Sequence, residues 1–121
     1  MLDVSEKVGK LLDEVCEYFN YEVDYYFVHV PADSTLPCIV YSELSNLDYD
    51  YYTGMEVSEI TFKFTIYSID PEFIFDLRKV LDATLYEAGF LKRNVSQVSY
   101  IEPCYMQSYQ YFIRVYDIYN K

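Results

Sequence analysis

The sequence contains no tryptophan, a single histidine (His29), three glycines and three cysteines in 121 residues. So few glycines leave no room for a phosphate-cradling loop, and the pattern G-x-x-x-x-G-K does not occur. Cys16, Cys38 and Cys104 are widely spaced and form no C-x-x-C pair. This odd, scattered set argues against a disulfide framework and against a zinc site, and it fits a reducing cytoplasm best.

Positive charge and long apolar runs are also scarce. Nine basic residues stand against twenty acidic ones, so the net charge is −11. Binding to duplex nucleic acid needs clustered lysine and arginine, and this balance disfavours it. No apolar run approaches the roughly 18 residues of a transmembrane helix, and acidic residues in the first turns argue against a signal peptide. We therefore expect a small acidic domain of the cytoplasm that binds neither nucleic acid nor membrane.

Tyrosine and aliphatic residues are abundant instead. The chain has 16 tyrosines and eight phenylalanines, and 52% of its residues are hydrophobic. This composition is typical of a folded globular chain and not of a disordered acidic tail. A chain of 121 residues has room for one hydrophobic core, and no repeat or linker divides it. We expect a single domain over residues 1–121.

Two segments have the pattern of amphipathic helices. Apolar residues recur with helical spacing over residues 4–19, where Asp3 is the expected N-cap. The second helix is expected to begin at Pro71 behind an Asp70 N-cap and to end at Gly89. Its expected buried stripe consists of Phe73, Ile74, Leu77, Val80, Leu81 and Leu85.

Strand-forming residues occupy segments 25–30, 38–44, 59–67, 94–102 and 110–118. The clearest is 59–67, in which apolar residues alternate with mostly polar ones. The polar, tyrosine-rich segment 45–56 is expected to form a long hairpin connection, and 103–108 a hairpin between the last two strands. No strand–helix–strand unit repeats. The expected fold is therefore α+β: one mainly antiparallel β-sheet of about four to five strands with two helices packed on one face.

The sequence offers no recognisable catalytic set. His29 lies in a predicted strand without a nucleophile at a familiar spacing, and the cysteines occupy apolar positions, so structural roles are favoured for all of them. A pair of carboxylates for acid–base chemistry stays an open alternative, but twenty acids make some pair inevitable. Asp48, Asp50 and Glu56 lack the D-x-D-x-D-G-x5-E frame of a calcium loop. We expect no catalytic residue, no metal ion and no cofactor, and hence no enzyme.

Tyrosines cluster in segment 45–56 and along the last strand. Tyrosine buries a large area while it keeps a polar tip, and it is enriched at protein interfaces. The last strand carries apolar or aromatic residues on both faces, whereas a sheet with helices on one side should have one polar face. Either a partner chain covers the second face, or a loop or helix of the same chain does. The candidate interaction residues are Asp48, Tyr49, Asp50, Tyr51, Tyr52, Tyr67, Tyr111 and Phe112.

The layout resembles a known family in five features. These are the N-terminal helix, the proline-led strand at 36–41, the variable segment 45–56 before the alternating strand Ile60–Ile66, the Ser68-Ile-Asp-Pro helix start, and the closing strand at 112–116. In this pattern the chain is similar to the tail-completion proteins of long-tailed bacteriophages and prophages, also called tail-terminator or head–tail joining proteins.

The resemblance implies a non-catalytic structural protein that forms a ring, typically a hexamer. Its partners would be further copies of itself and the tail-tube and head-connector proteins. Its location would be the host bacterial cytoplasm during assembly and then the virion. The acidic composition supports a different alternative, an inhibitor that mimics DNA, such as an anti-defence protein. That alternative needs Asp13, Glu14, Glu17 and Asp48 to line one face.

Overall fold

A computed structural model describes residues 4–28, 36–51 and 55–118, and for residues 48–51, 55–56 and 116–118 the description covers the backbone alone. The described chain forms two helices and six strands. In order, they are α1 (Ser5–Tyr18), β1 (Asp24–Phe27), β2 (Cys38–Tyr51), β3 (Met55–Ser68), α2 (Pro71–Glu87), β4 (Leu91–Val95), β5 (Ser99–Ile101) and β6 (Cys104–Ile118).

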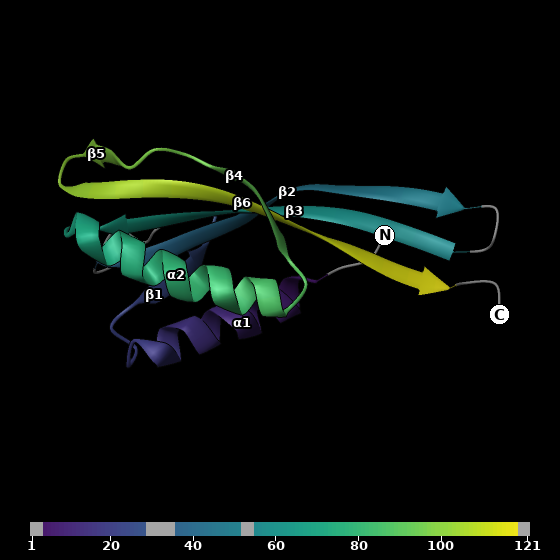
Figure 1. The fold of residues 1–121 in the computed structure, drawn as a ribbon, viewed down its shortest axis with the longest axis horizontal. Helices are drawn as coiled ribbons and strands as arrows, with labels where there is room; N and C mark the ends of the chain where they lie inside the picture. Colours follow the sequence, from purple (N-terminus) through teal and green to yellow (C-terminus); the bar gives the residue numbers. More distant parts are fainter. Residues whose placement is uncertain (1–3, 29–35, 52–54, 119–121) are drawn as a thin grey trace.

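The strands form one sheet in the order β1-β2-β3-β6-β4, and β5 also pairs with β6. The β1–β2 pair is parallel, and the other pairs are antiparallel. Both helices pack on the same face of the sheet (Figure 1). This architecture confirms the expected α+β fold, with six strands instead of four to five because segment 94–102 contributes to two short strands and not to one.

The hydrophobic core lies between the two helices and the sheet. On the central strand β3, Ile60, Phe62, Phe64 and Ile66 are fully buried, which confirms the apolar face expected from their alternation. The neighbouring strand β6 adds Tyr109, Tyr111 and Ile113 to this layer through its register with β3. The helices supply the opposite layer with Val8, Leu12, Val15, Ile74, Leu77, Leu81 and Leu85.

The ends of α2 follow the expected capping chemistry. Asp70 is the N-cap, its Oδ1 accepts a hydrogen bond of 2.9 Å from the Glu72 backbone N–H, and Pro71 opens the helix. Beyond the last turn, Gly89 has φ of +99°, a conformation that only glycine adopts without strain. Short-range sequence signals therefore define this helix correctly at both ends.

The first helix begins differently. The N-cap position is Val4, and no side chain caps it with a hydrogen bond, so the expected Asp3 cap is wrong. Asp3 and His29 themselves lie outside the described residues. The strand expected at 25–30 is the shorter β1, which ends at Phe27 and is followed by Val28 with φ of +74°. Within the described residues, neither helix has the length and hydropathy needed to cross a membrane.

Two expected loops are strands. Segment 45–56 was expected to be a hairpin connection, but β2 and β3 stay paired as far as Tyr51 and Met55. Segment 103–108 was expected to be a turn, but β6 begins at Cys104, and a tight turn joins it to β5. The first error arose because polar composition was given more weight than the alternation of residues 47–51, which has the period of two that a strand requires.

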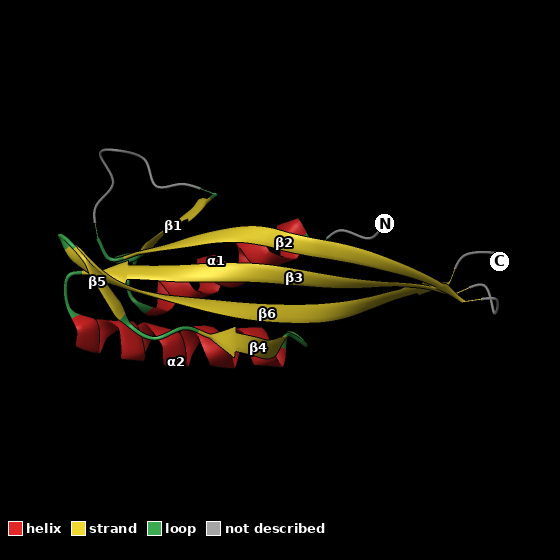
Figure 2. Cartoon of the chain, turned by 90° about the horizontal axis from the view of Figure 1, so that it is seen from above, coloured by secondary structure: helices red, strands yellow, loops and turns green. Residues whose placement is uncertain are grey.

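The long strands extend well past the helices at one end of the molecule (Figure 2). Ile60 and Ile113 form the last row that contributes to the buried core cluster, and the buried Val57 and Ser58 and the half-buried Val115 lie just beyond it. Beyond them, residues 47–51, 55–59 and 114–118 continue as three paired strands, which we call the blade. Five residues of extended strand span about 17 Å. The outer rows of the blade therefore project past both helices (Figure 2), whereas its inner rows still contain the buried Val57 and Ser58.

Candidate functional site

The sheet face opposite the helices, here called the open face, is covered by neither helix (Figures 1 and 2). The register places the even-numbered residues of β6 and the odd-numbered residues of β3 on this face, because their neighbours along each strand face the core. The centre of the open face is polar, with Thr61, Thr65 and Gln110 among its residues. An antiparallel sheet with one open face is ordinary, so the residues that depart from this polar pattern are the informative ones.

Six of those residues form a group at the root of the blade. One row across the sheet consists of Leu47, Glu59 and Arg114, which are direct partners on β2, β3 and β6. The next row pairs Phe112 with Leu91 of β4. Together with Arg93, these residues make up the open-face cluster: Leu47, Glu59, Leu91, Arg93, Phe112 and Arg114.

Glu59 holds the two arginines of the cluster. Its Oε1 accepts a hydrogen bond of 2.9 Å from Arg93 Nη2, and its Oε2 accepts one of 3.0 Å from Arg114 Nε. The Glu59 side chain is only 11% exposed, whereas the two arginines are 42% and 56% exposed. The hydrogen bond from Arg93, and to a smaller extent the one from Arg114, lowers the pKa of the Glu59 carboxyl below its ordinary value. The carboxylate therefore stays ionised and fixes two guanidinium groups at the surface.

Phe112 lies between these guanidinium groups. The Arg93 guanidinium carbon is 4.2 Å from the centre of the Phe112 ring, and that of Arg114 is 5.6 Å away. Both distances are within the range of cation–π attraction. Leu47 and Leu91 flank the group and are each about half exposed. Arginine and aromatic residues are enriched at protein interfaces, and arginine is frequent among the residues that contribute most binding energy there.

The expected interaction residues are distributed over three places. Phe112 is half-buried in the open-face cluster. Tyr67 is half-buried on the same face but at the opposite end of the sheet, paired with Cys38 and Met106, and burial raises the pKa of its hydroxyl. Tyr111 is a correction: it is 2% exposed and packs in the core beneath the helices, so it offers no surface to a partner.

The other expected residues belong to the blade or to its tip. Asp48, Tyr49, Asp50 and Tyr51 lie on β2, and their backbones are paired with β3. Tyr52 lies outside the described residues.

The strand register of the blade places acidic residues opposite one another in one row and apolar or aromatic residues opposite one another in the next. Asp50, Glu56 and Asp117 are partners in one row, and Tyr49, Val57 and Tyr116 are partners in the next. Like charges at directly opposite positions destabilise a sheet. The row therefore places three acidic residues at neighbouring positions near the end of the blade.

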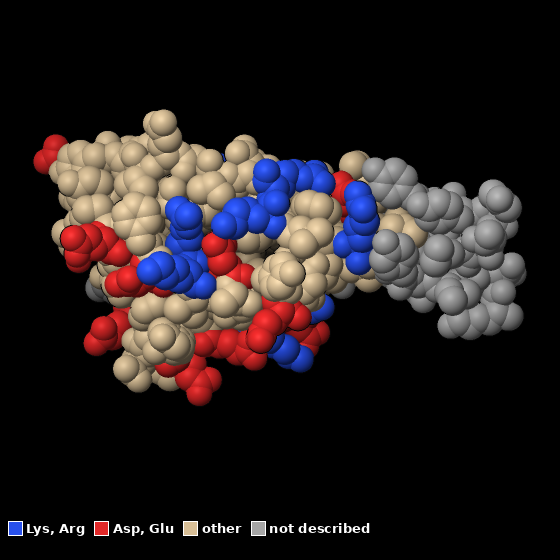
Figure 3. Space-filling view, in the orientation of Figure 1, with Lys and Arg blue, Asp and Glu red and all other residues tan. Residues whose placement is uncertain are grey.

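Charge is distributed unevenly over the molecule. Each helix carries four acidic and two basic residues. Lys63, Arg93 and Arg114 instead lie on the sheet, at the open face or its edge strand. In the face shown in Figure 3, basic side chains gather near β4 and β6, and acidic ones are most frequent over the helices. The helix layer is therefore mainly acidic, whereas basic side chains gather at the open face and its edge strand.

The structure also locates the residues that a metal ion or redox chemistry would need. Among the residues that the structure describes, no group of three or more histidine, cysteine or acidic side chains could hold a metal ion. Cys16, Cys38 and Cys104 are buried and free, as expected from their apolar positions. Burial raises the pKa of the Cys16 and Cys38 thiols to about 11, which leaves them protonated at neutral pH.

Sequence analysis missed Glu59, Arg93 and Arg114. Part of the signal was present, because Phe112 and Arg114 are two residues apart and must share a face of their strand. The contribution of Arg93 could not be seen, since it depends on the pairing of β4 with β6. A scan against protein-family models gives no match to this chain, and a search of curated proteins gives none either.

Proposed function

We propose that the chain is a structural protein of a bacteriophage or prophage that completes or caps the tail at the head–tail junction by assembling into a ring. The observation that carries the proposal is the blade, a part of the sheet that extends beyond both helices (Figure 2). Small sheets without a packed hydrophobic face are marginally stable in water, and packing against another layer stabilises them. In a chain of this size, a second copy is the simplest source of that layer.

The contact that we propose joins the blade of one copy to the open face of the next. The row of Asp50, Glu56 and Asp117 gives the blade negative charge, and Arg93 and Arg114 give the open face positive charge. Two different surfaces meet in such a contact, so each copy can bind one neighbour on either side. A contact of this kind generates a ring when the rotation between copies closes.

The remaining features fit the same role. The ring, a hexamer in the proposal, joins the tail-tube and head-connector proteins, forms in the host bacterial cytoplasm and remains in the virion. It has no catalytic task and needs no cofactor. The helix layers carry the excess of acidic residues, and like-charge repulsion would keep DNA from adhering to the assembly.

The first test is the size of the assembly in solution. Light scattering coupled to gel filtration is run at several protein concentrations, with and without the tail-tube protein. We expect a discrete oligomer whose population rises with concentration or on addition of the tube protein. A chain that stays monomeric under all these conditions and binds neither tube nor connector protein contradicts the proposal.

The second test removes the charges of the open face. The triple variant Glu59→Gln, Arg93→Gln, Arg114→Gln changes the net charge by −1 and leaves no uncompensated charge in the cluster. We expect the oligomer to dissociate at least tenfold more readily, because the proposed contact loses its positive partner. The matched control is Glu6→Gln, Lys7→Gln, Lys10→Gln on α1, which also changes the net charge by −1 and should assemble like the unmodified chain.

The DNA-mimic inhibitor remains a second candidate because the helix layer is acidic. Asp13, Glu14 and Glu17 all lie on α1, where the Asp13 carboxylate accepts a 2.6 Å hydrogen bond from the Tyr25 hydroxyl. Asp48 lies on β2 in the blade, so the four acids come from two separate parts of the molecule. A monomer that captures a host nuclease tightly, and loses it in moderate salt, would favour this candidate over the ring.

A further inference from the structure

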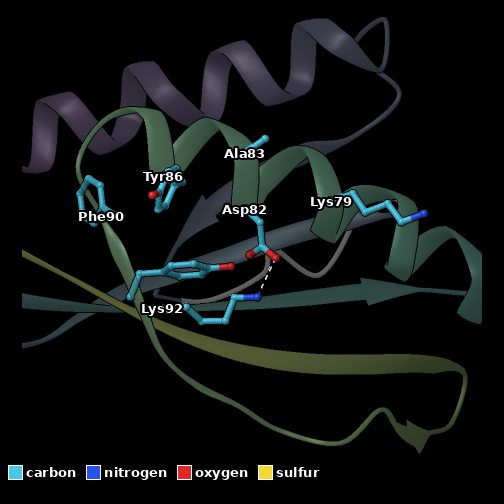
Figure 4. Close-up of a pocket in the computed structure, with 7 residues that line it drawn as sticks. Lys79, Asp82, Ala83, Tyr86, Phe90 and Lys92 are labelled. Atoms are coloured by element: carbon cyan, nitrogen blue, oxygen red, sulfur yellow. Dashed lines mark hydrogen bonds and ion pairs between the residues drawn. The ribbon is translucent and has the colours of Figure 1, made fainter.

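A cavity of about 440 Å³ lies between α2 and the edge of the sheet (Figure 4). Its walls come from three elements and from the segment that follows α2. The lining residues are Lys79, Asp82, Ala83, Tyr86, Phe90, Lys92 and Tyr111. In the close-up, the side chains of Asp82 and Lys92 point toward each other, and Phe90 and Tyr86 lie to the left of this pair. The volume falls within the range of sites for small molecules.

Two polar atoms beside this cavity are buried without a hydrogen-bond partner among the described residues: the Tyr111 hydroxyl and Asp82 Oδ1. Tyr111 as a whole is 2% exposed. Burying a hydroxyl or carboxylate oxygen without a partner is costly, and native proteins satisfy nearly all such groups. A ligand that accepts a hydrogen bond from Tyr111 and donates one to Asp82 would satisfy both groups.

The charges around the cavity restrict that ligand further. Lys92 Nζ lies 2.8 Å from Asp82 Oδ2 and compensates the carboxylate. A cationic ligand would have to displace this lysine, and an anionic one would meet the unpartnered carboxylate oxygen. Phe90, Ala83 and the ring of Tyr86 offer apolar contact to the rest of the ligand. An uncharged group with a donor beside an acceptor, attached to a flat apolar ring, satisfies all of these conditions.

We propose that this cavity is a binding site for a small uncharged aromatic amide or lactam. The amide N–H donates to Asp82 Oδ1, and the amide oxygen accepts from the Tyr111 hydroxyl. The ring packs against Phe90 and Tyr86. The site lies on the helix side of the sheet, away from the open-face cluster, and it does not depend on the proposed ring assembly.

Benzamide is the probe that tests the site. The full-length ¹⁵N-labelled chain is titrated with benzamide and followed by two-dimensional NMR. We expect saturable shifts confined to residues of α2, β4 and β6 around the cavity, with a dissociation constant of about 1 mM or tighter for a ligand of this size. Shifts scattered over the surface, or no saturation, would overturn the proposal.

Matched ligands and variants separate hydrogen bonding from general apolar binding. Benzoate and toluene have the same ring but lack the donor, so each should bind at least threefold more weakly than benzamide. The variants Tyr111→Phe and Asp82→Asn should each weaken benzamide by about threefold to tenfold, whereas Tyr67→Phe on the open face should leave it unchanged. The site is not the one proposed if toluene binds as tightly as benzamide, or if Tyr111→Phe binds it unchanged. Because the oligomer is measured separately, either proposal can fail alone.

Discussion

Glu59 is the residue on which the open-face cluster depends. Its carboxylate sits on the central strand, nearly buried, and bonds one guanidinium with each oxygen. Arg93 lies on β4 and Arg114 on β6, the strand of Phe112, and both guanidinium groups lie close to the Phe112 ring. Glu59 therefore also fixes how Phe112 is covered. Because the arginines are about half exposed, water screens these ion pairs, and their value is smaller than for a fully buried pair.

Replacing Glu59 with glutamine should change how stability depends on pH. The pKa of Glu59 is lower in the folded chain than its ordinary value of 4.5. The ionised Glu59 carboxylate therefore contributes its full stabilisation above about pH 4.5. That contribution is lost as the pH falls through the lower pKa that Glu59 has in the folded chain. We expect Glu59→Gln to cost about 1 kcal/mol at pH 7, and this cost should disappear as the pH falls through the lowered pKa of Glu59 in the folded chain.

Urea unfolding at a series of pH values measures this effect. Glu22→Gln is the control, because Glu22 is exposed and its change should leave the curve near that of the unmodified chain. An equal destabilisation by Glu59→Gln at pH 7 and pH 3 would show that the contribution is packing and not charge.

At the scale of single residues, sequence patterns predicted what depends on near neighbours. Phe112 was identified as a surface aromatic because its strand has apolar residues on both faces. The prediction that Tyr111 contacts a partner was wrong, since alternation shows that two neighbours lie on opposite faces but not which face meets the helices. Arg93 joins the site only through strand pairing, which no local pattern encodes.

At the scale of elements, the helix α2 was predictable and the β2–β3 hairpin was not. Helix ends are determined by residues a few positions apart, and Asp70, Pro71 and Gly89 carry those signals. The hairpin is held by pairing along its whole length, from Cys38 with Tyr67 to Tyr51 with Met55. Residues 45–56 suggested a loop because they are polar and acidic, and no short-range signal shows that this segment pairs with β3.

The cap of α2 gives a prediction at this scale. Replacing Asp70 with alanine removes the hydrogen bond to the Glu72 backbone N–H, which then lacks an acceptor. We expect a loss of about 1 kcal/mol in the free energy of unfolding and a fall of about 4 °C in Tm. Thermal unfolding by circular dichroism measures it. Asp76→Ala, an exposed change inside the same helix, is the control and should shift Tm by less than half as much; equal shifts would argue against the cap.

The whole molecule has two parts with different tasks. The helices and the inner rows of the sheet form the core that makes the chain fold. The blade begins beyond the row of Ile60 and Ile113, and Val57, Ser58 and Val115 in its inner rows are buried or half-buried. Its outer rows project past both helices. This division predicts that the outer part of the blade can be changed without unfolding the domain, and that the change will affect assembly instead.

A shortened hairpin tests that division. Deleting residues 50–51 and 55–56 removes two rows from the tip, and the even number keeps every remaining residue on its original face. We expect Tm to stay within about 3 °C, because the removed rows lie outside the core cluster. We also expect the oligomer to be lost in light scattering, since the row of Asp50 and Glu56 is gone. A large fall in Tm would assign the blade to the folding core, and an oligomer that persists would move the contact between copies elsewhere on the molecule.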